Sequence, residues 1–194
     1  MNNTKHKLCV ALITMTSLFA SFTVLATPVV DSKTQNKSPK NVGVSADQFK
    51  MNFNKLAQQL GAPTIKKIQL VNDGSGKTFS IQMPNHLAMI GNTDRNGILT
   101  RLSVGLDVAE VSPNELRDHS MMLGGFAVTA IKALDQNKVD QKRDDAVQDV
   151  YESLFVDKKT FTSRNTKYKI YKNFKLVAFS DPKMGVIMIG AEAK

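Results

Sequence analysis

The stretch LSVGLDVAEVSPNEL, residues 102–116, contains the change of pattern that decides the fold. In its first half, Leu102, Val104 and Leu106 alternate with other residues, as in a strand with one buried face. In its second half, Ser112 precedes a proline, and Glu115 follows three residues after Ser112. A cap, a proline in the first turn and a glutamate that reaches back are typical of a helix start. We therefore expect a strand to end and a helix to begin within this stretch.

A second helix start lies near the beginning of the predicted domain. Ser45, with Gln48 three residues later, forms a capping box. The apolar residues that follow recur at spacings of four, three and four, which predicts one buried stripe: Phe49, Phe53, Leu56 and Leu60. Gly61 and Pro63 then end the helix.

Between the two helix starts the apolar pattern has a period of two. It is clear in residues 67–70, 79–83 and 102–106 and weaker in residues 87–89. The glycine-rich stretch NDGSG separates the first two segments, and Asn96-Gly97 marks a tight turn before the last. These residues predict an antiparallel meander.

After Ser112 the chain returns from helices to strands. The buried face of the first helix is predicted to contain Leu116, Leu123, Ala127, Ala130 and Leu134, with Gly124-Gly125 allowing a close backbone contact. A second, shorter helix follows, with one face formed by Val147, Val150, Tyr151 and Leu154. The tail contains the strand-like segments YKIY, KLVAFS and GVIMIG, and SDPKMG joins the last two as a tight turn.

The predicted order is therefore α-ββββ-αα-βββ. Runs of strands that alternate with runs of helices favour an α+β fold. We expect a single domain in which an antiparallel β-sheet of about six or seven strands packs against about three helices. No internal repeat is evident along the sequence, and no stretch carries a motif that identifies a family.

The N-terminal residues predict export. The basic segment MNNTKHK is followed by the apolar segment LCVALITMTSLF and by small residues that end at Ala26. This organisation indicates a signal peptide over residues 1–26, and we expect a periplasmic or secreted protein after cleavage. An uncleaved N-terminal anchor is the alternative.

The polar residues 27–43 predict a flexible leader, and residues 44–194 the single domain. Cys9, inside the predicted signal peptide, is the only cysteine of the chain. A mature chain without cysteine has no disulfide, so its stability has to come from a packed core.

Two short motifs resemble ligand-binding loops but lack parts of them. GSGKT, residues 74–78, ends like a phosphate-binding loop, yet Val71 stands where that loop needs glycine, and a strand pattern follows instead of a helix. NTDRNG, residues 92–97, opens like a calcium-binding loop, yet Ser103 stands where a glutamate should close the metal shell. We interpret both as turns and predict no nucleotide, cofactor or metal site, with a weak calcium site as the alternative at residues 92–97.

The residues favour a non-catalytic protein. The predicted mature chain has two histidines, His86 and His119, and the sequence contains no zinc-protease, serine-hydrolase or Cys/His zinc motif. We therefore predict no catalytic residue. A hydrolase whose site is assembled from distant residues, with His119 beside a carboxylate, stays open.

The positive charge is concentrated near the C-terminus. Residues 158–194 contain nine basic and two acidic residues, whereas residues 27–157 contain 15 of each. Within this region KYKIYKNFK mixes lysine with aromatic residues, a composition that suits anionic partners. The predicted binding residues are Lys167, Tyr168, Lys169, Tyr171, Lys172 and Lys175. The alternative is that these lysines only prevent sheet-to-sheet aggregation.

The sequence thus predicts an exported binding protein whose partner is another protein of the cell envelope, as an inhibitor, an immunity factor or an accessory of a larger assembly. An anionic surface or lipid is a second type of partner, and nucleic acid is not favoured. A lipid or small-ligand carrier is the main alternative, because the nine methionines and ten phenylalanines of the chain would suit an apolar cavity. The hydrolase is the other alternative, and the oligomeric state is not specified.

Overall fold

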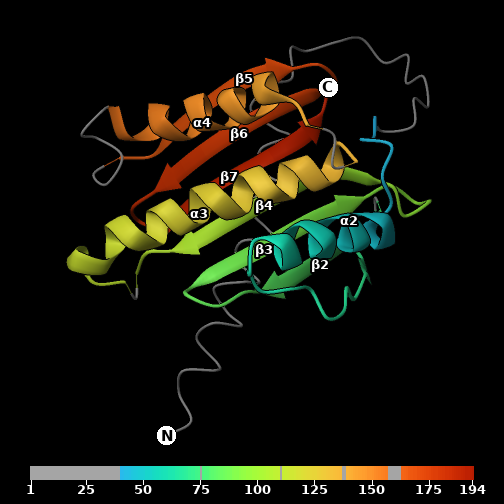
Figure 1. Cartoon of the computed structure of the whole chain (residues 1–194), viewed down its shortest axis with the longest axis horizontal. Helices are drawn as coiled ribbons and strands as arrows, with labels where there is room; N and C mark the ends of the chain where they lie inside the picture. Colours follow the sequence, from blue (N-terminus) through green and yellow to red (C-terminus); the bar gives the residue numbers. More distant parts are fainter. Residues whose placement is uncertain (1–39, 75, 110, 137–138, 157–162) are drawn as a thin grey trace, which may run out of the picture. The chain divides into compact units, whose positions relative to one another are not determined.

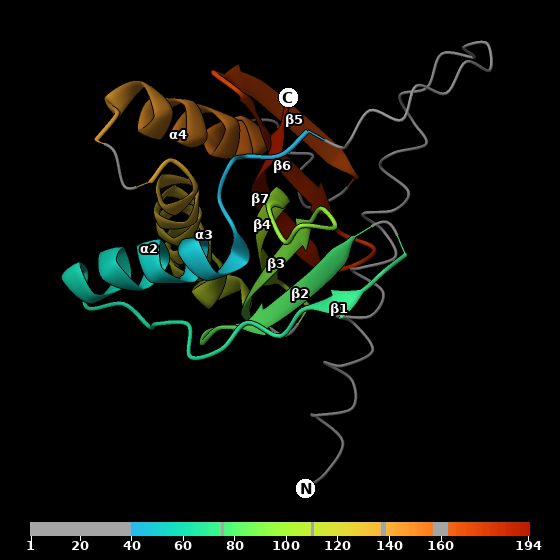
Figure 2. The same cartoon turned by 90° about the vertical axis from the view of Figure 1, so that its right-hand side faces the viewer.

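Seven antiparallel strands form one sheet, and three helices cover one of its faces, in the computed structural model, which describes residues 40–74, 76–109, 111–136, 139–156 and 163–194 (Figure 1). Figure 2 shows the helices on one side of the sheet. In chain order the elements are α2 (Ala46–Gln59), β1 (Val71–Asn72), β2 (Lys77–Gln82), β3 (Leu87–Thr93), β4 (Leu99–Asp107), α3 (Pro113–Leu134), α4 (Gln141–Val156), β5 (Asn165–Tyr171), β6 (Phe174–Asp181) and β7 (Val186–Ala193). This order confirms the predicted α+β fold.

The predicted signal peptide, residues 1–26, and residues 27–39 of the predicted leader lie outside the described residues. Packing begins before the predicted domain start. Val42 is buried, and its main-chain N–H donates to the Leu99 carbonyl at 2.8 Å. None of the helices in the described part of the chain combines the length and the apolar character needed to cross a membrane.

The strand order is β1-β2-β3-β4-β7-β6-β5. β4 and β7 are therefore neighbours, although the chain between them forms two helices and two strands. They pair antiparallel, with Val104 opposite Ile189. The predicted meander is confirmed for β1 to β4, and a second meander joins it in reverse order, which places β5 at the outer edge of the sheet.

The two halves of the sheet are built alike, a similarity that the sequence did not reveal. α2 precedes the strands β2–β4, and α4 precedes the strands β5–β7. The last turn of each half begins with an aspartate whose carboxylate accepts a hydrogen bond from the main-chain N–H two residues later: Asp94, at 2.9 Å, and Asp181, at 3.0 Å. Each turn ends with a glycine of positive φ, Gly97 or Gly185. The repeat lies in the architecture and in a few turn residues, so no repeated sequence accompanies it.

The main core lies between the sheet and the helices. The cross-strand register places Leu102, Ala191 and Leu176 in one row on the helix-facing side, and all three are buried. Aromatic rings connect α2 to α3, since the ring centroids of Phe53 and Phe126 lie 6.3 Å apart. The Tyr151 hydroxyl donates to the Ser120 carbonyl at 2.7 Å and so ties α4 to α3.

Both predicted helix starts are confirmed, with differences in detail. The Ser45 hydroxyl accepts from the Gln48 main chain at 3.1 Å, but the Gln48 side chain donates to Asn52 instead of reaching back. At the start of α3, the Ser112 hydroxyl donates to the Glu115 carboxylate at 2.6 Å. This hydrogen bond lowers the pKa of Glu115 below its ordinary value.

Three expectations about local packing were wrong in part. Leu60 lies beyond the end of α2 and is 68% exposed, so the predicted stripe ends with Leu56. Gly124 does lie against the ring of Tyr151, but Gly125 has no neighbour where a side chain would stand. The strand expected at residues 67–70 is absent, and pairing is confined to β1.

Asn54 fixes the chain just before the missing strand. Its side-chain amide donates to the Ile65 carbonyl at 2.9 Å, and its side-chain oxygen accepts from the Ile65 N–H at 2.7 Å. The segment after α2 is thereby held against that helix before it reaches the sheet. The alternating residues 67–70 follow this attachment, and pairing with the sheet begins only at Val71.

A substitution at Gly190 tests how closely β4 and β7 approach each other. A Cβ atom at Gly190 would stand 2.5 Å from the Leu102 carbonyl oxygen and 2.4 Å from the Ser103 hydroxyl oxygen. We expect Gly190→Ala to lower the free energy of unfolding by about 3 kcal/mol, because main-chain atoms of β4 would have to move. Chemical denaturation measures this.

Gly105→Ala is the matched control in the same strand pair. A Cβ atom there would meet the Met188 side chain at 3.4 Å, an ordinary contact. Its unfolding free energy should change by less than about 1 kcal/mol. Equal effects of the two substitutions would contradict the tight contact at Gly190.

Candidate functional site

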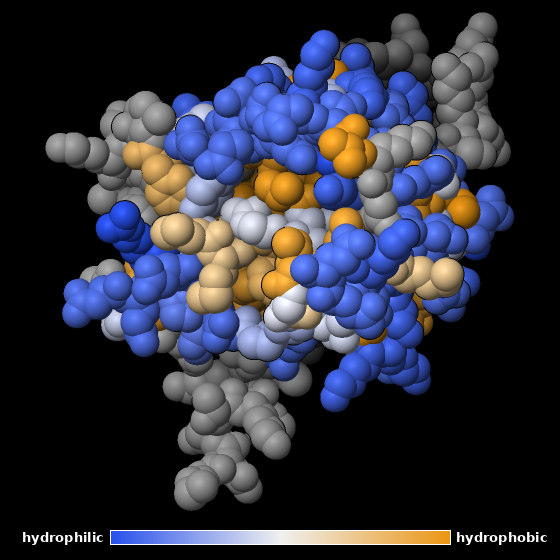
Figure 3. Space-filling view, in the orientation of Figure 1, coloured by the Kyte–Doolittle hydropathy of each residue, from blue (hydrophilic) through white to orange (hydrophobic). Residues whose placement is uncertain are grey.

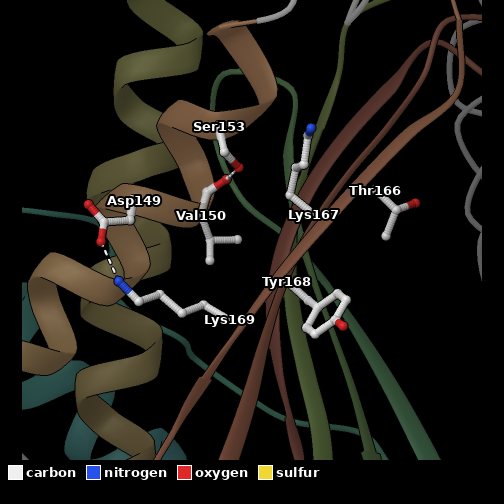
Figure 4. A pocket seen from close by; sticks show the side chains of 7 residues that line it. All are labelled: Asp149, Val150, Ser153, Thr166, Lys167, Tyr168 and Lys169. Atoms are coloured by element: carbon white, nitrogen blue, oxygen red, sulfur yellow. Dashed lines mark hydrogen bonds and ion pairs between the residues drawn. The ribbon is translucent and has the colours of Figure 1, made fainter.

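β5 is the edge strand next to α4, and its side chains alternate between two environments. The register pairs Lys167 with Ala178 and Lys169 with Leu176, both of which face the helices. Thr166 and Tyr168 therefore lie on the opposite face of the strand. Figure 4 shows this arrangement, with Lys169 directed toward α4 and Tyr168 away from it.

A surface hollow of about 310 Å³ follows this strand. α4 contributes a carboxylate, an aliphatic side chain and a hydroxyl, and β5 contributes four consecutive residues (Figure 4). The lining residues are Asp149, Val150, Ser153, Thr166, Lys167, Tyr168 and Lys169. Because consecutive strand residues point to opposite faces, a hollow lined by all four lies along the outer edge of β5.

The structure brings only part of the predicted binding residues together. Lys167, Tyr168 and Lys169 line the hollow. Tyr171 is 8% exposed and belongs to the core, so it offers little surface. Lys172 lies in the turn after β5, with φ at 49°, and Lys175 is on β6. The predicted set is thus divided between the strand edge, the hairpin turn and the next strand.

Carboxylates offset much of the charge that the sequence concentrates here. Lys169 pairs with Asp149 at 2.5 Å, and Lys172 pairs with Asp140 at 2.6 Å. Lys175 pairs with a carboxylate of β7 at 2.9 Å, and its Nζ atom lies 5.5 Å from the centre of the Tyr168 ring. Counting residues 158–194 alone could not show this, because Asp140 and Asp149 come from an earlier segment.

Asp140 joins the start of α4 to the β5–β6 hairpin. Its carboxylate accepts from Lys172 Nζ and from the Tyr171 hydroxyl, and these two hydrogen bonds lower the pKa of Asp140 well below its ordinary value. The hydrogen bond to Asp140, followed by one to Tyr171, raises the pKa of Lys172. Burial, followed by the bond to Asp140, raises the pKa of Tyr171. This cluster therefore fixes the hairpin beside the hollow and does not project into it.

Arg143 anchors the same end of α4. Its side chain is 0% exposed and forms ion pairs with Asp135 at 3.1 Å and Asp144 at 2.6 Å. These contacts connect the end of α3 to the first turn of α4. A buried guanidinium needs such partners. We therefore infer that Arg143 helps to hold α4 in its position over the sheet.

His119, the histidine of the hydrolase hypothesis, is engaged within its own helix. Its Nδ1 atom lies 2.9 Å from the main-chain carbonyl of Glu115, one turn earlier. The ring of His86 stands against it, with the centroids 5.8 Å apart. The Glu115 carboxylate is itself held by Ser112. The contact that orients the His119 ring is therefore a main-chain carbonyl of its own helix.

The two loop-like motifs form turns. The Asp73 carboxylate accepts from the Gly76 N–H at 2.8 Å, and β2 begins immediately afterwards, at Lys77. Asp94 is 6% exposed, and its carboxylate accepts from main-chain N–H groups and from the Asn41 amide. Both sequences serve strand connections, as predicted.

Asp140 gives a pH-dependent prediction. Because its folded-state pKa is lowered, its contribution to stability is present above the ordinary pKa, about 4, and is lost as the pH falls below that value. We expect Asp140→Asn to lower the Tm at pH 7, and the difference from the unsubstituted protein to shrink between about pH 4 and pH 2. Thermal unfolding followed by circular dichroism measures both.

Asp149→Asn is the control, since it removes an ion pair whose two side chains are 47% and 58% exposed. Exposed pairs contribute little, so its Tm should stay close to that of the unsubstituted protein. A Tm difference for Asp140→Asn that is the same at pH 7 and pH 2 would contradict the role of its charge.

Known proteins give no further guide to this surface. Comparisons of the chain with family models, with curated proteins and with solved structures found no match.

Proposed function

We propose that the protein is an exported, non-catalytic binding protein whose partner is another protein of the cell envelope, and that it binds through the outer edge of β5. One observation carries the proposal: the hollow is lined by Lys167, Tyr168 and Lys169, the first three residues of the predicted binding sequence. Lysine supplies attraction for an anionic partner, and tyrosine supplies contact area.

The lining groups support binding rather than bond cleavage. A nucleophile needs an adjacent base, and that base needs an orienting group. The Ser153 hydroxyl donates to the Val150 carbonyl at 2.7 Å, within its own helix, and Lys169 is paired with Asp149. Neither arrangement activates an oxygen or nitrogen atom for attack.

The same hollow gives little support to the alternative of a lipid or small-ligand carrier. Pockets for small apolar ligands are concave, deeply enclosed and lined mainly by apolar side chains. Here the hollow is open to solvent along the edge of β5, and two lysines and one carboxylate are among its lining residues. Large phenylalanines such as Phe49, Phe53 and Phe174 are buried in the core.

A second exposed feature also suits a binding protein. Figure 3 shows apolar residues along α3, between the hydrophilic surfaces of α2 and α4. Met121, a residue of α3, is 64% exposed. Apolar surface of this kind adds contact area for a protein partner but does not identify it.

Removing the two lysines of the hollow tests the proposal. We expect the double variant Lys167→Gln, Lys169→Gln to retain about tenfold less of its partner from the envelope fraction, because attraction at the contact surface is lost. Quantitative pull-down with the purified protein, at two salt concentrations, measures the loss.

The double variant Lys66→Gln, Lys67→Gln is the matched control, because both lysines are exposed and it removes the same net charge. It should retain the partner as the unsubstituted protein does. Equal losses from the two double variants would indicate nonspecific charge attraction, and no loss from either would exclude this surface.

A further inference from the structure

We propose that β5 binds its partner by strand addition, and that the added strand is an extended segment in which acidic side chains alternate with apolar ones. This inference rests on the proposed function, since it specifies how the same surface binds and what it recognises. Three features carry it: the main-chain groups of the edge, the space beside them, and the different side chains on the two faces of β5.

The hairpin register determines which main-chain groups of β5 point outward. Tyr171 pairs with Phe174 across a two-residue turn. In such hairpins the residues that flank the turn exchange both main-chain hydrogen bonds, and every second residue repeats that pairing. The main-chain groups of Lys169 and Lys167 are therefore directed to β6, whereas those of Ile170, Tyr168 and Thr166 point away from the sheet. In the described part of the chain, no strand pairs with that outer side.

The hollow supplies the space for another strand. Neighbouring strands lie about 4.8 Å apart, so an added strand would run along the outer edge of β5, where the hollow is. Val150 and Ser153 of α4 border it on the helix side. Strand addition uses main-chain hydrogen bonds for affinity and alternate side chains for specificity.

The two faces of β5 define the side chains that an added strand should carry. On the helix side, the lysines Lys167 and Lys169 line the hollow, and Lys169 pairs with Asp149. On the opposite side, Tyr168 is 67% exposed and Ile170 is 44% exposed. Acidic residues therefore suit one face of the incoming segment, and aliphatic or aromatic residues suit the other.

The same charges disfavour a second copy of this chain. If two β5 strands paired antiparallel around Tyr168, each Lys167 would stand opposite a Lys169. If they paired parallel and in register, each lysine would stand opposite its own counterpart. Like charges directly opposite one another destabilise a strand pair. Lysines on edge strands prevent self-association in this way. The alternate lysines of β5 thus disfavour pairing with a second β5 strand and favour pairing with an acidic strand.

Synthetic peptides test the recognition pattern. The probe is acetylated and amidated Glu-Val-Glu-Val-Glu-Val-Glu, titrated into the purified protein by calorimetry. We expect one peptide to bind per chain, and the same residues in the order Glu-Glu-Glu-Glu-Val-Val-Val to bind at least about tenfold more weakly. Equal binding of the two peptides would overturn the proposal, because it would show charge attraction without strand pairing.

Proline substitution tests the main-chain groups. Tyr168→Pro removes an outward-pointing N–H and leaves the pairing with β6 in place, a position where edge strands accept proline. Its affinity for the alternating peptide should fall at least about tenfold below that of Tyr168→Ala, which removes only the side chain. Equal affinities of these two variants would overturn strand addition.

N-methylated peptides give a test that does not depend on folding of the variant. Methylation of the valine nitrogens or of the glutamate nitrogens removes one of the two alternate sets of peptide N–H groups. Strand addition predicts that only one of these sets is needed for binding to the unsubstituted protein. If both methylated peptides lost binding, or if neither did, strand addition would be contradicted.

The outcomes separate this inference from the proposed function. If Lys167→Gln, Lys169→Gln loses the envelope partner while Tyr168→Pro retains it, the surface is correct and strand addition is wrong. If neither variant loses the partner, the proposed function fails at this surface.

Discussion

The antiparallel contact between β4 and β7 is the constraint on which the rest of the sheet depends. It joins two similar halves, and it allows a close approach because Gly190 has no side chain to meet Leu102 and Ser103. Once β7 occupies this central position, β6 and then β5 follow outward in short hairpins. The location of β5 at the edge is thus a consequence of pairing far from it.

The position of α4 turns that edge into a defined surface. Arg143 and Asp140 hold the beginning of α4 near the end of α3 and the β5–β6 hairpin. Asp149, farther along the same helix, then reaches Lys169. One helix therefore compensates part of the lysine charge and also forms a wall of the hollow. The remaining surface combines main-chain groups with different side chains on the two faces of the strand.

The sequence predicted the local elements because their chemistry is local. Ser45 and Ser112 mark helix starts, and Asn96-Gly97 marks a turn, through residues that act within a few positions. The strand at residues 67–70 was wrong, and the chain just before it is bound at Ile65 by Asn54, a residue of the preceding helix. Local alternation could not reveal that contact.

The candidate site was predictable only in part, for the same reason. The lysine and tyrosine pattern predicted binding in the segment that forms β5, and this stays a prediction. Its neighbours could not be inferred, because Lys169 and Lys172 meet carboxylates that are 20 and 32 residues away in the chain. Those pairs depend on how α4 crosses the sheet, and the strand order depends on the β4–β7 contact.

Residue-resolved hydrogen exchange of the free protein tests most directly whether β5 is an open edge. An open edge predicts an alternating pattern, with slow exchange of the Lys167 and Lys169 N–H groups, which face β6, and fast exchange of the Tyr168 and Ile170 N–H groups. Slow exchange at all four positions would show that the outer side of β5 is already paired, and would contradict an edge that is available to a partner.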